Sequence, residues 1–417
     1  MPAISGFGKR VCAWGILAAL PTVLSAQTIV VPQGGEFSIL GPVPGDQVHP
    51  SLSLSSSGRA CLVWQDNVID GKGAGVGGSL LSGSDFSAGR MFRVNKTATG
   101  NQINPQIQVL AGGNLLMVWQ SSVTGVSDIY ARSAKNGTNF FTADVRVNSY
   151  VKDANTHPAV AALADGSAIV VWQSHGQDTK EWGVYARKLL KSGLPTTGKE
   201  FLVNQFKSNQ RNPAVAALAN GNFVVVWVSD QQRSLVSSDV YARIFSAGGV
   251  ALSDELPVNP GVTNFCSNPQ VAALNDGGFT VVWAAKDLWT PTNGWDIWGR
   301  AFSAVGQPTV AAFRINTYLY GDQYLPRIAS GPSGCLVVWT SLAQDGDREG
   351  VFGRFLAGGS EVSGKEFQVN TTWTSMQIHP CVAWDGMSQY LVVWSSFSGS
   401  SGFDLYGQAY VLSSSSP

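Results

Sequence analysis

The chain has 417 residues, of which 44% are hydrophobic and only 13% charged, and it carries 27 basic and 27 acidic residues. Binding to the phosphate backbone of nucleic acids needs a basic excess, so this balance argues against a nucleic-acid partner. Glycine occurs 47 times. Low charge combined with many glycines is typical of a β-rich protein with many tight turns.

The first 26 residues resemble a signal peptide. Lys9 and Arg10 precede the apolar run VCAWGILAALPTVL, which is too short for a membrane span, and small residues follow at Ser25 and Ala26. Removing residues 1–26 leaves a net charge of −2 (25 minus 27). No later segment is apolar for about 18 residues. We therefore expect a secreted, periplasmic or cell-surface protein without a transmembrane segment.

The rest of the chain repeats with a period of 53–56 residues. Each repeat opens on a proline and ends an apolar run on a tryptophan. The tryptophans, by which we number repeats 1 to 7, are Trp64, Trp119, Trp172, Trp227, Trp283, Trp339 and Trp394. The prolines are Pro50, Pro105, Pro158, Pro213, Pro269, Pro326 and Pro380. Two independent markers with one period indicate a repeat architecture.

Each repeat is predicted to form four short strands. In repeat 4, AVAAL from Ala214 and NFVVVW up to Trp227 are joined at Asn220-Gly221, a dipeptide that suits tight hairpin turns. The second strand is apolar at consecutive positions, so both of its faces should be buried. The third strand is DVYARIF and the fourth is a segment such as EFLVN. Four-stranded units buried on both faces are typical of β-propeller blades.

The two ends of the chain complete each other. After Trp394 the sequence contains a third strand but no EFxVN segment, whereas GGEFSIL at 34–40 stands before repeat 1. An N-terminal strand that completes the last blade would close a ring and remove its exposed edges. We predict one all-β domain at 27–412, a seven-bladed β-propeller of four-stranded blades closed by 34–40, and a Ser-rich tail at 413–417.

The repeat pattern P-x-V-A-x-L-x-[DN]-G-x-x-V-V-W, followed by [DE]-[IV]-[YW]-[AG]-[RQ] and E-F-x-V-N, resembles exported bacterial β-propeller proteins, some of them surface or adhesin-like. The resemblance covers about 34–412. It implies the fold, but it names no reaction, since such propellers are mostly uncharacterised. The period is too long for WD40 repeats, and the S-x-D-x-G-x-x-W boxes of sialidase-like propellers are absent from the sequence.

Recurrent polar residues are predicted to be structural. A set of arginines follows the aromatic residue of strand three and alternates with aromatic residues, which favours packing and cation–π contact over ligand binding. These are Arg132, Arg187, Arg243, Arg300 and Arg354. A set of aspartates opens strand three and is expected to accept hydrogen bonds from backbone N–H groups of turns. These are Asp128, Asp239, Asp296 and Asp404.

Two sets of side chains, one of histidines and one of carboxylates, are of the kinds that bind metal ions. His49, His157 and His379 precede the opening proline where other repeats have Asn104, Asn212 and Asn268. The exchange of His and Asn favours a loop hydrogen bond over a zinc site. Asp345, Asp347 and Glu349 alternate in the loop QDGDREG and offer oxygen ligands to Ca²⁺, but the full twelve-residue calcium loop is missing. We therefore favour a solvated acidic loop and predict no metal or cofactor.

Four cysteines follow the expected signal peptide: Cys61, Cys266, Cys335 and Cys381. An exported protein can form disulfides, and four thiols allow three pairings. Three of these cysteines lie within apolar strand stretches, so buried thiols are the favoured interpretation. A Cys335–Cys381 bridge between neighbouring repeats is the best alternative.

The candidate binding residues are aromatic. Loops between strands two and three share a face with the connections to the next blade, and these are the longest and least repetitive segments. Aromatic residues there are expected to bind a ligand, with packing between loops as the alternative. They are Trp182, Trp289, Trp295, Tyr318, Tyr320 and Trp373, and His175 and Asp178 stand near the first of them.

No motif names a catalytic reaction, since GxSxG, HExxH and phosphate-binding glycine loops are absent from the sequence. We expect a non-catalytic propeller that binds a glycan or a protein through the variable-loop face. The alternatives are an extracellular polysaccharide lyase or hydrolase on the same scaffold and a structural component of the cell envelope.

Overall fold

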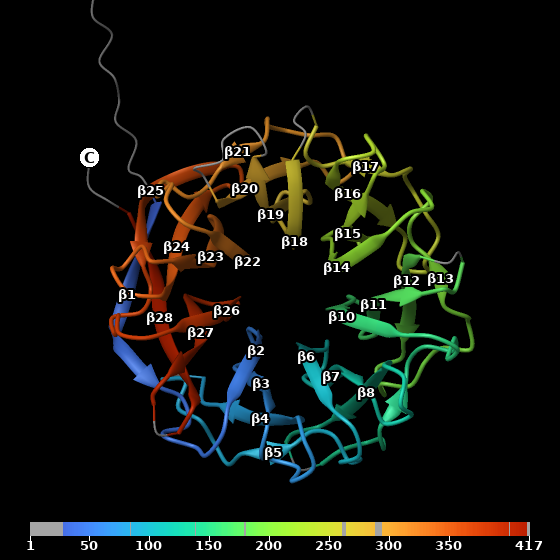
Figure 1. Ribbon diagram of the computed structural model, residues 1–417, viewed down its shortest axis with the longest axis horizontal. Helices are drawn as coiled ribbons and strands as arrows, with labels where there is room; N and C mark the ends of the chain where they lie inside the picture. The colour runs from blue at the N-terminus through green and yellow to red at the C-terminus, as the bar shows by residue number, and fades with distance from the viewer. Residues whose placement is uncertain are drawn as a thin grey trace, which may run out of the picture.

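The computed structural model describes residues 28–83, 85–137, 139–178, 181–260, 264–287, 294–399 and 401–414. The expected signal peptide at 1–26 and Trp289 lie outside these residues. Within them, all the secondary-structure elements are β-strands, and the sheets form a ring around a common axis (Figure 1). The described part of the chain contains no helix that is long and apolar enough to cross a membrane.

The strands of repeats 1 to 3 form three sheets, each ordered outward from the axis as in the sequence. The first holds β2 (Gln47–Leu54), β3 (Ala60–Asp66), β4 (Gly75–Leu81) and β5 (Phe92–Arg93). The second holds β6 (Gln102–Val109), β7 (Leu115–Ser121), β8 (Asp128–Ala134) and β9 (Val145–Arg146). The third holds β10 (Asn155–Ala162), β11 (Ala168–His175), β12 (Trp182–Leu189) and β13 (Phe201–Leu202).

Repeats 4 and 5 share one eight-stranded sheet, in which β16 meets β18 through a single parallel pair, Ser238 with Phe265. Repeat 4 supplies β14 (Gln210–Ala217), β15 (Phe223–Asp230), β16 (Ser238–Phe245) and β17 (Leu256–Pro257). Repeat 5 supplies β18 (Asn264–Ala273), β19 (Phe279–Asp287), β20 (Trp295–Phe302) and β21 (Phe313–Arg314). Apart from that single parallel pair, the strand pairs within this sheet are antiparallel.

Repeats 6 and 7 form the remaining two sheets. Repeat 6 supplies β22 (Gln323–Gly331), β23 (Gly334–Leu342), β24 (Glu349–Ala357) and β25 (Glu361–Gln368). Repeat 7 supplies β26 (Gln377–Trp384), β27 (Gln389–Phe397) and β28 (Phe403–Ser414), and β1 (Thr28–Ser38) completes its sheet.

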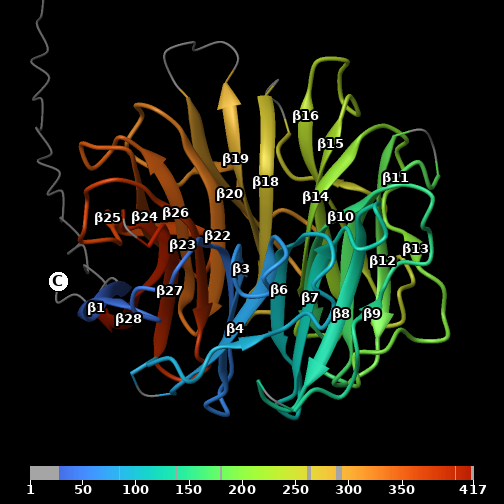
Figure 2. The same ribbon diagram turned by 60° about the horizontal axis from the view of Figure 1, so that its bottom comes forward.

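β1 closes the ring by pairing antiparallel with β28 (Figures 1 and 2). Phe37 pairs with Gly407 and Ser38 with Tyr406, which confirms the expected pairing of the N-terminal strand. The strand is longer than expected, because Thr28–Gln33 also pairs with β28 and a bulge separates Gln33 from Phe37. β28 ends at Ser414, inside the segment expected to be a tail.

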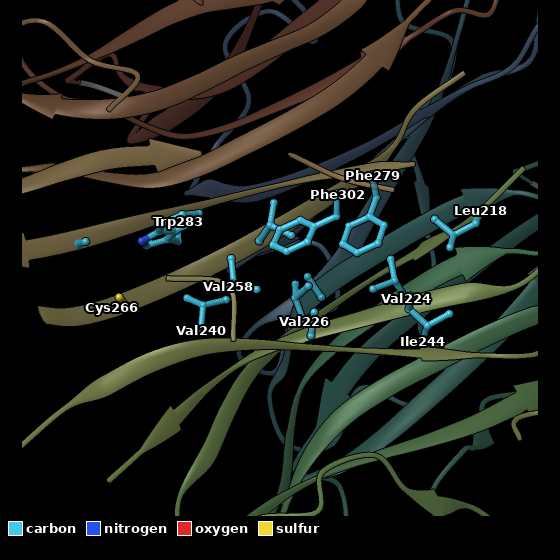
Figure 3. Close-up of a cluster of buried hydrophobic side chains, with 14 residues drawn as sticks. Leu218, Val224, Val226, Val240, Ile244, Val258, Cys266, Phe279, Trp283 and Phe302 are labelled. Atoms are coloured by element: carbon cyan, nitrogen blue, oxygen red, sulfur yellow. The ribbon is translucent and has the colours of Figure 1, made fainter. Parts of the chain in front are cut away.

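The core lies between neighbouring sheets. All seven repeat tryptophans are at most 1% exposed, and the second strands are buried on both faces, as β7 is throughout. Figure 3 shows the cluster between repeats 4 and 5, where the rings of Phe279 and Phe302 stack 5.1 Å apart. Gly77 pairs with Trp64, and a Cβ there would lie 2.4 Å from the indole, so only glycine fits.

The recurrent arginines connect neighbouring sheets. Nη1 of each donates to a carbonyl just beyond strand four of the preceding repeat, as from Arg132 to Val94 O at 2.6 Å and from Arg243 to Val203 O at 2.8 Å. Arg187, Arg300 and Arg354 make the same contact at 2.7–3.0 Å. Arg132, Arg243 and Arg300 also lie over phenylalanine rings. The packing and cation–π interpretation is therefore confirmed.

Carboxylates make a second set of connections between repeats. Glu200 in repeat 3 accepts from the backbone N–H groups of Ser149 and Tyr150, at 2.6 and 3.1 Å. Glu36 of β1 accepts from Thr371 and Thr372 at 2.6 and 3.2 Å. Glu36 of the N-terminal strand thus makes for repeat 7 the same backbone contacts with the preceding connection that Glu200 makes for repeat 3.

The aspartates that open strand three correct one expectation. Asp128, Asp239 and Asp296 accept from the side-chain amides of Asn148, Asn259 and Asn316, at 2.6–2.9 Å. Each of these asparagines follows the end of strand four by two residues, and Asn148 and Asn316 also donate to a carbonyl two residues further along the chain. Asp404 has no such neighbour, since Leu40 takes that position, and it accepts from the backbone N–H of Val43 at 3.1 Å.

The four described cysteines are free and buried, so the favoured interpretation is confirmed and the Cys335–Cys381 bridge is not formed. Burial raises the pKa of the Cys335 and Cys381 thiols to about 12.

Candidate functional site

The variable segments of neighbouring repeats meet at one end of the ring. A loop between strands two and three and a connection into the same repeat are joined by backbone hydrogen bonds. Ser122 N donates to Asn101 O at 3.0 Å, and Leu342 N donates to Asp322 O at 2.9 Å. This shared face is the one that the sequence indicated.

The connection from repeat 5 to repeat 6 presents two tyrosines. The Tyr320 ring is 73% exposed and lies edge-on to the Tyr318 ring, with centroids 5.8 Å apart. The backbone beneath them is anchored: Asn316 donates to Tyr318 O at 2.8 Å, and Gln323 donates to Tyr320 O at 2.9 Å. The pair is therefore held on a rigid support.

The connection from repeat 6 to repeat 7 presents Trp373, which is 55% exposed. Its backbone is also anchored. Asn370 donates to Thr372 O at 2.9 Å, and Gln377 donates to Thr374 O at 2.8 Å. Because ordering the backbone is a cost that binding would otherwise carry, an exposed ring on an anchored connection suits ligand binding.

Loop 343–348 lies between these two connections and is tied to both. Glu366 accepts from Gln344 Nε2 on the loop and from Thr317 N and Oγ1 on the tyrosine side. Asp347 accepts from Ser375 N on the tryptophan side at 2.7 Å. We call the surface formed by Tyr318, Tyr320, Asp347 and Trp373 the aromatic–acidic face.

The carboxylates of this loop do not gather into a metal site. Asp345 accepts from Gln368 at 3.2 Å, Asp347 accepts from Ser375, and Glu349 interacts with the Tyr324 hydroxyl. In the described residues no group of three or more His, Cys, Asp or Glu side chains could hold a metal ion. Asp347 is exposed and can accept hydrogen bonds from ligand hydroxyl groups.

Trp295 takes a different position from the one expected. It is the first residue of β20 rather than part of a loop, it is half-buried, and it packs against the core between repeats 5 and 6. Its backbone N–H donates to Asp322 Oδ1 at 3.1 Å, so β20 begins beside the tyrosine connection.

Trp182 belongs to a separate group in repeat 3. It is half-buried and opens β12, with its ring 5.1 Å from His175. His175 Nδ1 contacts Asp153 Oδ2 at 2.7 Å, and this hydrogen bond lowers the pKa of the Asp153 carboxyl. Tyr150 donates to Gly176 O at 3.0 Å and anchors the loop. Of the five predicted aromatic residues that the structure describes, Trp182 therefore stands apart in repeat 3, and the other four lie in repeat 5 or in the connections that follow repeats 5 and 6.

The innermost strands carry a feature that the sequence did not reveal. The residue before each opening proline has a φ between 50° and 54°, and the strand register shifts there. A bulge of this kind redirects side chains. The residues are His49, Asn104, His157, Asn212, Asn268, Leu325 and His379. The loop position that was expected for the histidines and asparagines of this set is corrected, because all seven residues lie within β2, β6, β10, β14, β18, β22 and β26.

The three histidines do not form a zinc site. The rings of His49 and His379 stack with centroids 3.8 Å apart, while His157 comes from β10. Burial is the main cause that lowers the pKa of His49 to about 4 and that of His379 to about 3. The second cause is the charge of Arg327 for His49 and the neighbouring His49 for His379. Both imidazoles are therefore neutral at pH 7.

Two cavities lie among the innermost strands. One of about 120 Å³ is bordered by Gln106, His157, Asn212, Gln270 and Arg327 and by other residues at or next to the bulges. One of about 170 Å³ is lined by residues of β2, β6, β10, β14, β18, β22 and β26, with Arg327 again among them. Sequence analysis missed Arg327, although it stands alone at a position where other repeats have uncharged residues.

Comparison with known proteins gives a fold and no family. No protein-family model matches the chain, and no curated protein sequence matches it. Among solved structures, a protein of unknown function from Dyadobacter fermentans is similar, with a TM-score of 0.54 and 12% identity over 94% of this chain and 100% of that chain.

Two carbohydrate-active proteins are also similar in structure. An α-L-arabinanase from Penicillium chrysogenum complexed with arabinobiose has a TM-score of 0.52 and 14% identity over 74% of this chain and 92% of that chain. The polysaccharide lyase Uly1 has a TM-score of 0.52 and 8% identity over 90% of each chain. At these identities the similarity shows a propeller-like all-β fold.

Proposed function

We propose that this protein is an exported, non-catalytic propeller that binds a glycan through the aromatic–acidic face. The observation that carries the proposal is the placement of Tyr320 and Trp373, both largely exposed on anchored backbone, on either side of the loop that carries Asp347. Aromatic rings stack on the apolar faces of sugars, and a carboxylate accepts hydrogen bonds from their hydroxyl groups.

The fold is compatible with this function. The arabinanase structure contains arabinobiose, and Uly1 is a polysaccharide lyase, so similar scaffolds serve carbohydrate chemistry. Fold alone does not assign function, and the argument therefore rests on the face itself.

The proposal includes a seven-bladed ring. The eight-stranded sheet contains two sets in the order first, second, third, fourth strand, joined only by the single Ser238–Phe265 pair. Counting these sets as two blades gives one blade for each repeat tryptophan. The proposal also includes export, which rests on the signal-like residues 1–26 and places the protein in the periplasm, on the cell surface or outside the cell.

The test is a glycan-array screen followed by calorimetry with the glycans that bind. We expect Trp373→Ala and Tyr320→Ala each to weaken binding about tenfold or more, which is about 1.4 kcal/mol. Phe141→Ala is the matched control, because Phe141 is 48% exposed and lies in the segment between strands three and four, at the opposite end of the ring.

Binding that survives both substitutions would move the glycan site away from this face. An array without binding, together with a protein partner whose binding is lost in Trp373→Ala, would replace the glycan with a protein ligand on the same face. Equal loss in Phe141→Ala would indicate damage to the fold instead of loss of a contact.

One observation favours a second function, cleavage of a polysaccharide. His175 and Asp153 form a close pair beside Trp182, and a histidine positioned by a carboxylate is a common general base. Release of new chain ends from a polysaccharide by the wild-type protein, and not by His175→Ala, would support cleavage. Activity that persists in His175→Ala would exclude this pair.

A further inference from the structure

Arg327 places a permanent positive charge among the innermost strands, and no described residue serves as its counter-ion. It stands two residues after the bulge of β22 and borders both central cavities. Its guanidinium makes one hydrogen bond to the protein, from Nη1 to Pro326 O at 3.1 Å. Among the described residues, the ion pairs within 4.0 Å do not include Arg327.

The surroundings of Arg327 supply further donors and no negative charge. Neither cavity has Asp or Glu among its described lining residues. The smaller cavity is bordered by the side-chain amides of Gln106, Asn212 and Gln270, and these make no hydrogen bond to the described part of the protein. An amide that faces a cavity can turn its N–H₂ group toward an acceptor.

The histidines add neutral polar groups. Burial lowers the pKa of His157, which borders the smaller cavity, so that it is neutral at pH 7 and can offer one N–H group. His379 is not among the lining residues of either cavity, and its buried Nδ1 has no hydrogen-bond partner among the described residues. Unsatisfied buried polar atoms in a folded protein call for a partner such as water or an ion.

The smaller cavity is large enough for a small ion. The smaller cavity measures about 120 Å³, against the roughly 10–15 Å³ that one water molecule requires. It can therefore hold an oxyanion together with water. The opening of each innermost strand follows directly on the connection from the preceding repeat, so this region lies toward the same end of the ring as the aromatic–acidic face.

We propose that the smaller of the two cavities, the central cavity, binds a small oxyanion, with the Arg327 guanidinium as its counter-ion. The oxyanion is either a free inorganic anion or the carboxylate of an acidic sugar. The planar guanidinium can donate two parallel hydrogen bonds to a sulfate, phosphate or carboxylate, which a lysine cannot do. The surrounding amides complete the shell of donors. This site is separate from the aromatic–acidic face and does not depend on glycan binding there.

The test compares Arg327→Gln with wild type. Glutamine already stands at this position as Gln106 and Gln270, so the ring accommodates it. Arg90→Gln is the control, because Arg90 is exposed and the substitution removes the same charge. Calorimetry would use sulfate, phosphate and glucuronate, with glucose and chloride as probes that lack the oxyanion, at constant ionic strength.

We expect sulfate, phosphate or glucuronate to bind wild type and Arg90→Gln equally, and Arg327→Gln at least tenfold more weakly. Binding of glucuronate in competition with sulfate assigns the site to a carboxylate-bearing ligand, and binding of inorganic anions alone assigns it to a free ion. Equal binding by Arg327→Gln, or no oxyanion bound better than chloride, would overturn the proposal.

A second measurement needs no variant. A wild-type crystal soaked in selenate should show an anomalous scattering peak within hydrogen-bond distance of Arg327, and a central cavity without such a peak would count against the site. Trp373→Ala should bind the oxyanion as wild type does, so failure of the glycan proposal and failure of this one give different results.

Discussion

The imidazole rings of His49 and His379 stack 3.8 Å apart, although one comes from the first repeat and the other from the last. Their contact crosses the point where the ring closes. Burial is the largest cause that lowers the pKa of both groups. The charge of Arg327 and then His157 add to the effect on His49, whereas His49 and then Arg327 add to the effect on His379. The stack therefore connects closure of the ring to the protonation of two side chains.

Acid should destabilise the protein through this stack. The unfolded histidines titrate near 6.5, whereas the folded ones titrate near 4 and 3, so the stabilisation is present above pH 6.5 and is lost as the pH falls toward those values. Each histidine should contribute a slope of about 1.4 kcal/mol per pH unit between pH 6 and 4.5. Urea unfolding in chloride buffers measures it.

The matched variant for this prediction is His49→Asn/His379→Asn, since Asn104, Asn212 and Asn268 occupy the same position in other repeats. Its free energy of unfolding should fall much less steeply over that range. Identical slopes in both proteins would mean that other groups cause the acid sensitivity.

Glu36→Gln should weaken closure of the ring. The substitution removes the charge from an acceptor of the backbone N–H groups of Thr371 and Thr372. We expect a loss of about 1 kcal/mol in the free energy of unfolding. Glu200→Gln removes the equivalent contacts within the ring and should cost a similar amount. A neutral Glu36→Gln beside a destabilising Glu200→Gln would show that the two connections are not equivalent.

The repeat tryptophans should differ in their tolerance of phenylalanine. Trp227 donates from Nε1 to Gln210 at 2.7 Å, whereas the buried Nε1 of Trp339 has no partner among the described residues. Trp227→Phe leaves Gln210 Oε1 unpaired, so it should cost about 1–2 kcal/mol more than Trp339→Phe. Chemical denaturation of both variants measures the difference. Equal costs would mean that ring volume alone determines the effect.

A missing connection between repeats 4 and 5 should be restorable. The strand-four acid is replaced by Ala312 in repeat 5, and the first of the positions that donate N–H in other repeats is Pro260, which has no N–H. A double-mutant cycle with Pro260→Ser and Ala312→Glu should give a favourable coupling of about 1 kcal/mol. Additive effects of the two substitutions would contradict this explanation.

Much of the fold could be predicted because its signals repeat. The apolar run before Trp227 and the turn at Asn220-Gly221 recur in related form, so each repeat supports the interpretation of the others. The pairing of Phe37 with β28 followed from the absence of a fourth strand after Trp394. These signals depend on local periodicity and on the need to cover sheet edges, which a single sequence carries.

The central region could not be predicted in the same way. A residue before proline is ordinarily extended, yet His49 and Leu325 adopt positive φ at that position. The exchange of His with Asn at this position could have indicated a positive φ, since both residues tolerate the left-handed conformation. Leu325 breaks this pattern, because leucine seldom adopts that conformation. Arg327 has no counterpart in other repeats, and only the ring geometry brings it beside the histidines.

Exposure of the loop aromatics also depends on tertiary neighbours. Trp295 and Trp373 look equivalent in the sequence, since both stand in variable segments between strands. In the structure, Trp295 opens β20 against the core, and Trp373 remains 55% exposed. Which ring is free to bind depends on packing between repeats, which composition and spacing do not encode.

The pairing of β1 with β28 sets an order of events during synthesis. Thr28–Ser38 leaves the ribosome long before its partner Phe403–Ser414. At about 5–20 residues per second, the first strand waits roughly 20–80 s for that partner. Until then β1 has no strand to pair with, and its edges are open to association with other chains. A chaperone that holds the nascent chain unfolded until β28 has emerged would protect this protein more than one that promotes early folding.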